Sequence, residues 1–184
     1  MERLYFRKNA GLYFLFDGTD TQRQWLEQSL HLLEMEGLGT DRNVGHGAFT
    51  WDSDEVSIEI PDDAQHILTL GLYHPEDQAT LTSMVGDDDS IGWKLLKRGG
   101  WITNPAYQSI RKRSVYMFTE GSIFIKPGNF NGHIGLPAIN LQPREDEGDY
   151  PVNHPIWRCG RTLAFPIKIN ELWHQKYILF ISEY

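Results

Sequence analysis

The chain has 184 residues, of which 40% are hydrophobic, and this is enough for one large globular domain or two small ones. Its formal net charge of −8 at pH 7 argues against nucleic-acid binding through overall charge, so any RNA site must be local. The single cysteine, Cys159, excludes an intramolecular disulfide and a Cys-rich zinc site. No run of 18 apolar residues and no signal-peptide pattern is present, so we expect a cytoplasmic protein without a membrane partner.

The first sixty residues contain several strand patterns. Residues 12–16 form a short apolar and aromatic run that predicts a buried strand, and a weaker strand is predicted at 4–6. Residues 48–51 and 56–60 alternate between apolar and polar types, which predicts a strand pair or one bulged strand. We expect a boundary between two modules near residue 60.

One helix is predicted between these strands. Thr21 and Gln24 have the spacing of a capping box, and apolar residues recur at helical intervals up to Glu36. Gly37 is expected to end the helix at its C-terminal cap. Trp25 and the leucines of this helix are expected in the core.

A glycine-rich loop follows the helix. Residues 37–47 contain four glycines in eleven positions, with Arg42 between them. Such a cluster indicates positive φ angles or close approach of a ligand to the backbone, and its amides together with a guanidinium suit a phosphate or an RNA backbone. A surface loop that ends a helix is the alternative. Because the order is helix, glycines, strand, the P-loop and Rossmann patterns are excluded.

The second half of the chain predicts strands around one short helix. Residues 66–73 alternate, with Ile67, Thr69, Gly71 and Tyr73 on one face. Residues 75–77 open a short helix that runs to about Met84. Further strand signatures lie at 93–96, continued at 101–102 after a turn at 97–100, and at 114–118 and 122–125. Trp173 and residues 177–181 are expected to close the chain as a last strand or as a short helix and a strand.

Charge is clustered at two places in this half. Arg111, Lys112 and Arg113 form the densest positive cluster and either meet RNA phosphates or begin a solvated strand. Residues 87–89 are three adjacent aspartates that we interpret as a solvated loop, so we propose no metal site. Residues 127–153 are expected to form a long irregular loop.

The order of these landmarks resembles the RAMP superfamily of CRISPR-associated proteins. Residues 37–49 are similar to its glycine-rich loop, usually close to GIGGKRSSGLGRF. The Csm-type RAMP that holds the 5′ handle of the guide RNA in type III-A effector complexes has similar C-terminal motifs. They lie here at 70–75, 98–101, 111–124 and 154–160.

The resemblance implies an α+β fold of ferredoxin-like (RRM-type) modules, with antiparallel sheets, helices on one face and the glycine-rich loop between helix and strand. It also implies that residues 1–60 are the C-terminal part of a first module that carries the glycine-rich loop, and that residues 61–184 form the second. Because family members are longer, Met1 resembles an internal start or a truncated reading frame.

The implied function is a subunit without nuclease activity that binds the crRNA 5′ handle and docks on the large polymerase-like subunit, beside the backbone RAMP subunits. No cofactor is implied. The RNA-binding candidates are Gly37, Gly39, Arg42, Asn43, Gly45, His46, Gly47, Arg111, Lys112, Arg113 and Arg158. The sequence departs from the family loop at Thr40, Asp41 and Ala48, which removes two cations and adds an anion.

Two other functions fit the same residues. One is a metal-independent crRNA-processing endoribonuclease, with His46 or His154 as the general base and Arg42 or Arg158 on the scissile phosphate. The other is a protein-only structural adaptor of the complex, which leaves the glycine-rich loop unexplained. Cys159 carries no signature of a nucleophile.

Overall fold

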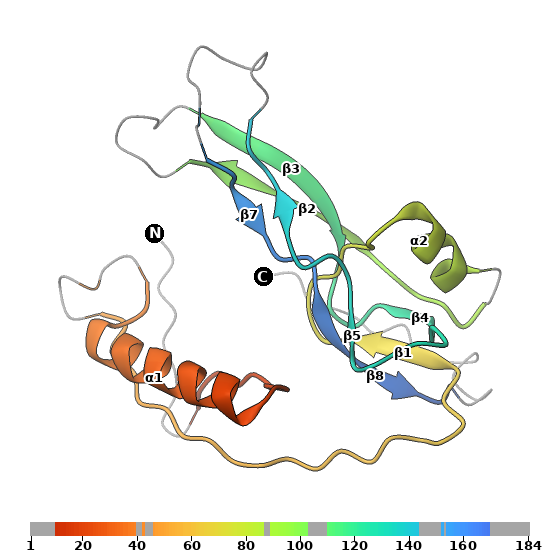
Figure 1. The fold of residues 1–184 in the computed structure, drawn as a ribbon, viewed down its shortest axis with the longest axis horizontal. Coiled ribbons are helices and arrows are strands. Elements are labelled where there is room, and N and C mark those ends of the chain that lie inside the picture. The colour runs from red at the N-terminus through yellow and green to blue at the C-terminus, as the bar shows by residue number, and fades with distance from the viewer. Residues whose placement is uncertain are drawn as a thin grey trace. The chain divides into compact units, whose positions relative to one another are not determined.

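The computed structural model of the chain describes residues 10–39, 42, 46–86, 89–102, 110–143, 152 and 154–169. The chain divides into two compact units, Met1–Ser57 and Ile58–Tyr184. Figure 1 shows one helix in the first unit and antiparallel strands with a second helix in the other. The predicted α+β class with ferredoxin-like antiparallel sheets is therefore confirmed. Neither helix in the described ranges is long and apolar enough to cross a membrane.

The described residues contain two helices and eight strands. These are α1 (Asp20–Glu36), β1 (His66–Thr69), α2 (Gln78–Val85), β2 (Leu95–Trp101), β3 (Arg111–Phe118), β4 (Ile123–Ile125), β5 (His133–Ile134), β6 (Ile139–Asn140), β7 (Trp157–Arg158) and β8 (Thr162–Ile167).

Helix α1 begins at a capping box two residues earlier than predicted. The Thr19 N–H donates to Gln22 Oε1 at 2.9 Å, and the Gln22 N–H donates to the Thr19 hydroxyl at 3.3 Å. The predicted box at Thr21 is wrong because Thr21 already lies within the helix. The C-terminal end is as predicted, since Gly37 caps the helix with φ +78°.

No residue of α1 is buried, so the prediction of a core helix is wrong. Residues 47–57 cover one side of it only: the Trp51 ring lies edge-on to His31 at 4.9 Å, and Glu55 lies 3.5 Å from Arg23. Trp25 remains 63% exposed. Spacing alone identifies which side chains share a helix face, but not whether another element covers that face.

The strands predicted at 12–16, 48–51 and 56–60 are also wrong, because those residues are described and have no strand partner. Tyr13 is 91% exposed rather than buried. A strand needs a neighbour for its backbone N–H and C=O groups, and no described segment provides one there. The strand predicted at 4–6 lies outside the described residues, as do Trp173 and residues 177–181, which are predicted to close the chain.

The second unit is organised around β1. This strand lies inside a four-stranded sheet of order β4-β1-β8-β5 and pairs antiparallel with both neighbours, so that His66 is opposite Ile125 on one side and Ile167 on the other. Ile67 and Thr69 are buried, as the predicted alternation requires. The strand ends at Thr69 instead of Tyr73, but Tyr73 is also buried and bridges Phe118 of β3.

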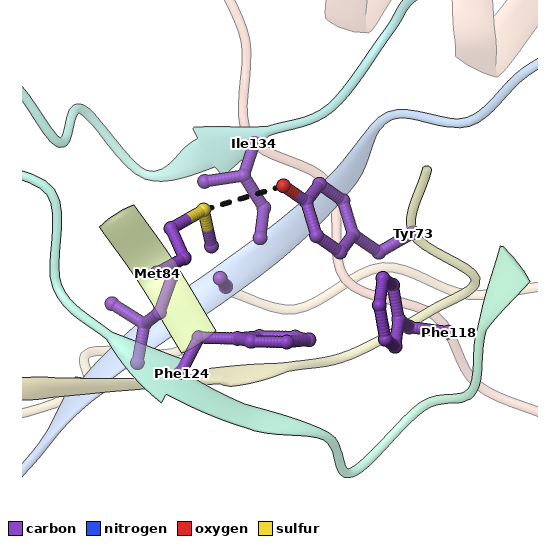
Figure 2. Packing of buried hydrophobic residues seen from close by; sticks show 7 residues of the cluster. Tyr73, Met84, Phe118, Phe124 and Ile134 are labelled. Atoms are coloured by element: carbon purple, nitrogen blue, oxygen red, sulfur yellow. Dashed lines mark hydrogen bonds between the residues drawn. The ribbon is translucent and has the colours of Figure 1, made fainter. Parts of the chain in front are cut away.

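An aromatic core covers one face of this sheet. Figure 2 shows the rings of Tyr73, Phe118 and Phe124 turned toward one another, with Met84 and Ile134 beside them. The Tyr73 ring centroid lies 5.7 Å from that of Phe118 and 5.5 Å from that of Phe124. The Tyr73 hydroxyl donates to Met84 Sδ at 3.3 Å, and burial raises the pKa of Tyr73 to about 12.

Helix α2 forms where the sequence predicts it. Asp77 is its N-cap and accepts a hydrogen bond from the Thr80 N–H at 2.7 Å, which lowers the pKa of this carboxyl group. Met84 is its buried residue and joins the helix to the aromatic core.

Strands β2 and β3 form a two-stranded ribbon that extends from the sheet in Figure 1. The turn predicted at 97–100 is wrong, because these residues lie inside β2 and the register shifts between Arg98 and Gly100 as a bulge. The outward end of β3 is held by a hydrogen bond from the Arg113 N–H to the Leu141 carbonyl at 2.8 Å. Val115, Met117 and Leu141 form a second buried cluster on this side of the ribbon.

The long irregular loop predicted at 127–153 is only partly observed. Strands β5 and β6 lie within it, and Ile134 and Leu141 are buried. Residues 144–151 and 153 are outside the described ranges.

A backbone junction connects three segments of the second unit. The His74 N–H donates to the Gly160 carbonyl at 2.8 Å, the Leu136 N–H to the His74 carbonyl at 3.0 Å, and the Gly160 N–H to the Leu136 carbonyl at 3.0 Å. Gly135 adjoins this triangle with φ +103°, and a Cβ there would lie 2.2 Å from the Gly160 oxygen. Only glycine fits this position.

Replacement of Gly135 tests the importance of the junction. Gly135→Ala should lower the free energy of unfolding by about 2–4 kcal/mol, because it adds backbone strain to a backbone clash. Denaturant titration followed by tryptophan fluorescence measures this change. Gly128→Ala is the control, since a Cβ there would meet nothing within 4 Å. Equal stability of the two variants would show that the junction is not required.

Candidate nucleic-acid interface

The glycine-rich loop is closed at its base by two glycines. The Leu38 N–H donates to the Gly47 carbonyl at 2.8 Å. Gly47 has φ +83°, and a Cβ on it would lie 1.8 Å from the Leu38 oxygen. The approach at Gly37 is less close, because a Cβ on it would lie 3.2 Å from the Gly47 oxygen. The glycines at the two ends therefore bring the loop together, as their clustering in the sequence indicates.

The described part of the loop between these ends presents one cation. Arg42 is exposed, and its Nη1 lies 3.5 Å from Glu36 Oε2. Gly39 has φ +100° and open space around it, and His46 is exposed. The loop also begins at the C-terminal end of α1, where the helix dipole is negative and does not attract phosphate. The attraction of the loop for an anion thus depends on a guanidinium that Glu36 partly neutralises.

Asn43 and Gly45 lie outside the described residues, as do Thr40 and Asp41. The RNA-binding role predicted for Asn43 and Gly45 remains a prediction.

The triplet Arg111, Lys112 and Arg113 lies inside β3 rather than before it. Arg111 and Arg113 are exposed, and Lys112 is half-buried. The Arg111 guanidinium lies over the Trp101 ring, 5.2 Å from its centroid. Where the chain is described, no acidic side chain pairs with any of the three.

The positive charge of the ribbon extends beyond the triplet. Residues 90–119 contain six Lys or Arg residues and no Asp or Glu, in a chain with 25 acids. The six are Lys94, Lys97, Arg98, Arg111, Lys112 and Arg113. The β2–β3 pairing brings five of them onto one ribbon. Sequence reasoning missed the contribution of β2, although thirty residues without an acid were a visible signal.

Arg158 belongs to the strand pair beside the ribbon. It is half-buried in β7 and stands opposite Ile139 of β6. Ile139 packs against the Val115 and Met117 cluster of β3, and β7 runs alongside the ribbon in Figure 1. The structure therefore gathers Arg158 and the triplet in the second unit, whereas the glycine-rich loop belongs to the first.

The candidate catalytic side chains have little support around them. His46 and His154 are exposed, and the ring Nδ1 of His154 lies 3.2 Å from the Pro155 carbonyl oxygen. Neither His is hydrogen-bonded to a carboxylate in the described chain. Cys159 is exposed and makes a weak contact to the Arg161 carbonyl.

The described residues include no group of three His, Cys, Asp or Glu side chains that would hold a metal ion. Asp87 and Asp88 of the aspartate run lie outside these residues.

Replacement of Gly47 tests the closure of the loop. Gly47→Ala should break the hydrogen bond from the Leu38 N–H, because the added Cβ would lie 1.8 Å from the Leu38 oxygen and 2.9 Å from the Leu38 nitrogen. Exchange of the Leu38 amide with deuterium, followed by NMR, should then become at least about tenfold faster. Gly11→Ala is the control, since Gly11 has open space around it. An unchanged Leu38 rate in Gly47→Ala would contradict the observed closure.

Comparison with known proteins is consistent with these features. Residues 62–167 match the family described as CRISPR Csm4 C-terminal domain. Relatives named "CRISPR system Cms protein Csm4" include one from Mycobacterium tuberculosis (strain CDC 1551 / Oshkosh), 28% identical over 162 residues, which cover 86% of this chain and 47% of the relative. The relative from Methanocaldococcus jannaschii is 27% identical over 183 residues, which cover 90% of this chain and 46% of the relative. The relative from Streptococcus thermophilus is 25% identical over 170 residues, which cover 89% of this chain and 50% of the relative.

The chain spans about half the length of the curated relatives it matches. The family match covers more than half of this chain and agrees with the resemblance to the Csm-type RAMP proteins. The chain therefore belongs to the CRISPR Csm4 C-terminal domain family.

Proposed function

We propose that this chain is a non-catalytic RNA-binding part of a type III CRISPR effector ribonucleoprotein that acts in antiviral defence. In this proposal it anchors the 5′ handle of the guide RNA, docks on the large polymerase-like subunit and lies beside backbone RAMP subunits. The observation that carries the proposal is the β2–β3 ribbon, whose cations have no acidic partner in the described chain.

Electrostatics supports RNA as the ligand of this ribbon. A chain with a net charge of −8 repels a polyanion on average, so binding needs a region where positive charge is concentrated. At physiological salt, charges further away than about 8 Å are largely screened, and the local cations then dominate what a phosphate experiences. A guanidinium group, such as that of Arg111 or Arg113, can also donate two parallel hydrogen bonds to two oxygens of one phosphate.

The glycine-rich loop is proposed as a second RNA contact. Its glycines allow an RNA backbone to approach closely, and Arg42 supplies the positive charge in the part of the loop that the structure describes. The contribution of Arg42 is modest while Glu36 lies 3.5 Å away.

Docking on a protein subunit is supported by the apolar surface of α1. Trp25, Leu32 and Met35 are 63%, 53% and 80% exposed, and large exposed apolar patches mark protein interfaces. In the described chain neither His46 nor His154, the general bases of the endoribonuclease alternative, is hydrogen-bonded to a carboxylate that could assist it.

Neutralising the triplet tests RNA binding by the ribbon. The combined variant Arg111→Gln, Lys112→Gln and Arg113→Gln should bind a labelled repeat-derived RNA at least about tenfold more weakly. The slope of log K against log salt should fall by about two units, since each lost contact with single-stranded RNA removes about 0.7. Fluorescence anisotropy across a salt series measures both quantities.

The matched control removes three cations from other places, as Arg23→Gln, Lys126→Gln and Lys168→Gln. Arg23 and Lys168 are paired with Glu27 and Asp63, so their charge is partly neutralised. Equal losses in the two variants would reject the ribbon as the RNA site. Specific cleavage of the RNA would instead favour the endoribonuclease.

Releasing Arg42 from its partner tests the loop. Glu36→Gln removes the carboxylate beside Arg42 and should raise RNA affinity by about two- to fivefold at low salt. This gain should disappear when Arg42→Gln is added, because the freed cation is then missing. A gain of the same size in the double variant would mean that Glu36 acts on RNA without Arg42.

A further inference from the structure

The two faces of the β2–β3 ribbon differ in what covers them. Side chains alternate along a strand, so Val115 and Met117 share one face of β3 and are buried against Leu141. The opposite face carries Ser114 and Tyr116, which are both exposed. At these positions of β3 the face of Val115 and Met117 is packed against the protein, whereas the face of Ser114 and Tyr116 is open to RNA.

A ring and a cation lie at one end of the open face. Tyr116 is 58% exposed, and Lys97 stands directly opposite it in the register of the ribbon. The Lys97 Nζ lies 5.8 Å from the centroid of the Tyr116 ring, close to the outer limit of a cation–π contact. The backbone carbonyl of Tyr116 accepts a hydrogen bond from the His74 ring at 3.0 Å, which fixes the strand at this point.

The middle of the face has almost no side chains. Gly99 lies against Ser114, and a Cβ on Gly99 would be only 3.2 Å from the Ser114 Cβ. Beyond them the stem of Lys112 lies across Gly100, with Cε 3.2 Å from the Cβ position. The face is thus a shallow floor with an aromatic ring and an ammonium group at one end and a second ammonium group at the other.

Resting on the proposed function, we propose that this face binds a short unpaired stretch of the RNA, with one base stacked on Tyr116. Lys97 and Lys112 bind the flanking phosphates, and the floor of Gly99 and Ser114 admits the sugar–phosphate backbone. A base offers its flat face to a ring only when it is unpaired and unstacked, so the ligand is single-stranded RNA and not a duplex.

Trp101 on the other face provides a matched control. It is 56% exposed, nearly as much as Tyr116, and it lies on the same ribbon. However, the Arg111 guanidinium lies over its ring at 5.2 Å, and the neighbouring positions on its face are Arg111 and Arg113 instead of a bare floor. A base would have to displace this broad guanidinium plane, which lies closer to the Trp101 ring than the Lys97 ammonium group lies to the Tyr116 ring, at 5.2 against 5.8 Å.

The experiment measures binding of the full chain to oligoadenylate and to the oligoadenylate–oligouridylate duplex. The unmodified chain should bind the single strand more tightly. Tyr116→Leu should weaken single-strand binding by about tenfold with an unchanged salt slope, because a stacked base is lost and no charge is removed. Tyr116→Phe should restore the affinity, and Trp101→Leu should change it by less than about twofold. Thermal unfolding followed by circular dichroism establishes that the variants are folded.

The contrary outcomes separate this inference from the proposed function. Equal binding of the two RNAs, no loss in Tyr116→Leu or an equal loss in Trp101→Leu overturns the stacking face. If replacement of the cation triplet still weakens binding in those cases, RNA binding by the ribbon stands. Failure of the unmodified chain to bind either RNA overturns both.

Discussion

The second unit depends on two consecutive backbone positions, Tyr73 and His74. Tyr73 exchanges both of its backbone hydrogen bonds with Phe118, at 3.0 and 2.8 Å, and so fixes the base of β3 to the segment that follows β1. His74 bonds to Gly160 and Leu136 and connects the same point to the segments next to β7 and β5. The sheet, the ribbon and the β6–β7 pair therefore meet at one place. The absence of side chains at Gly135 and Gly160 is what lets the three backbones approach.

This meeting point explains how a buried core can support an exposed binding surface. Phe118 contributes its ring to the aromatic core, while Met117, its neighbour, packs into the second cluster. Two cores thus hold β3 from opposite sides at its base. Further along the ribbon, the side chains become cationic and exposed. Because packing at its base holds the ribbon in place, its charged side chains are not needed for ion pairs that would fix it. They stay available for a ligand.

Local signals in the sequence predicted where helices lie, although the capping box of α1 is at Thr19 and not at Thr21. Gly37 and residues 75–77 mark helix ends because caps act over a few residues, and the alternation of Ile67 and Thr69 predicted their burial. Some predictions that needed a distant partner failed, whereas the strands predicted at 114–118 and 122–125 are present in β3 and β4. Residues 12–16 have the composition of a buried strand but no described strand beside them. Residues 97–100 have the composition of a turn but pair with β3 as a bulged part of β2. The interface shows the same division. The β3 triplet is visible in the sequence, whereas Tyr116 becomes a candidate only once the register places Lys97 and the glycine bulge next to it.

The bulge and the cations of β2 have a further consequence, for association between copies of the chain. In the described residues β2 pairs only with β3, so its outer edge carries backbone groups that another strand can bind. Lysine, arginine and a bulge are features that discourage such strand addition, because they place charge on the edge and break its regular spacing. Lys97, Arg98 and the Gly99–Gly100 pair combine them. The cations that give the ribbon its charge thus also discourage aggregation through this edge. A variant that lacks both these cations and the bulge would expose an edge strand able to pair with a strand of another copy.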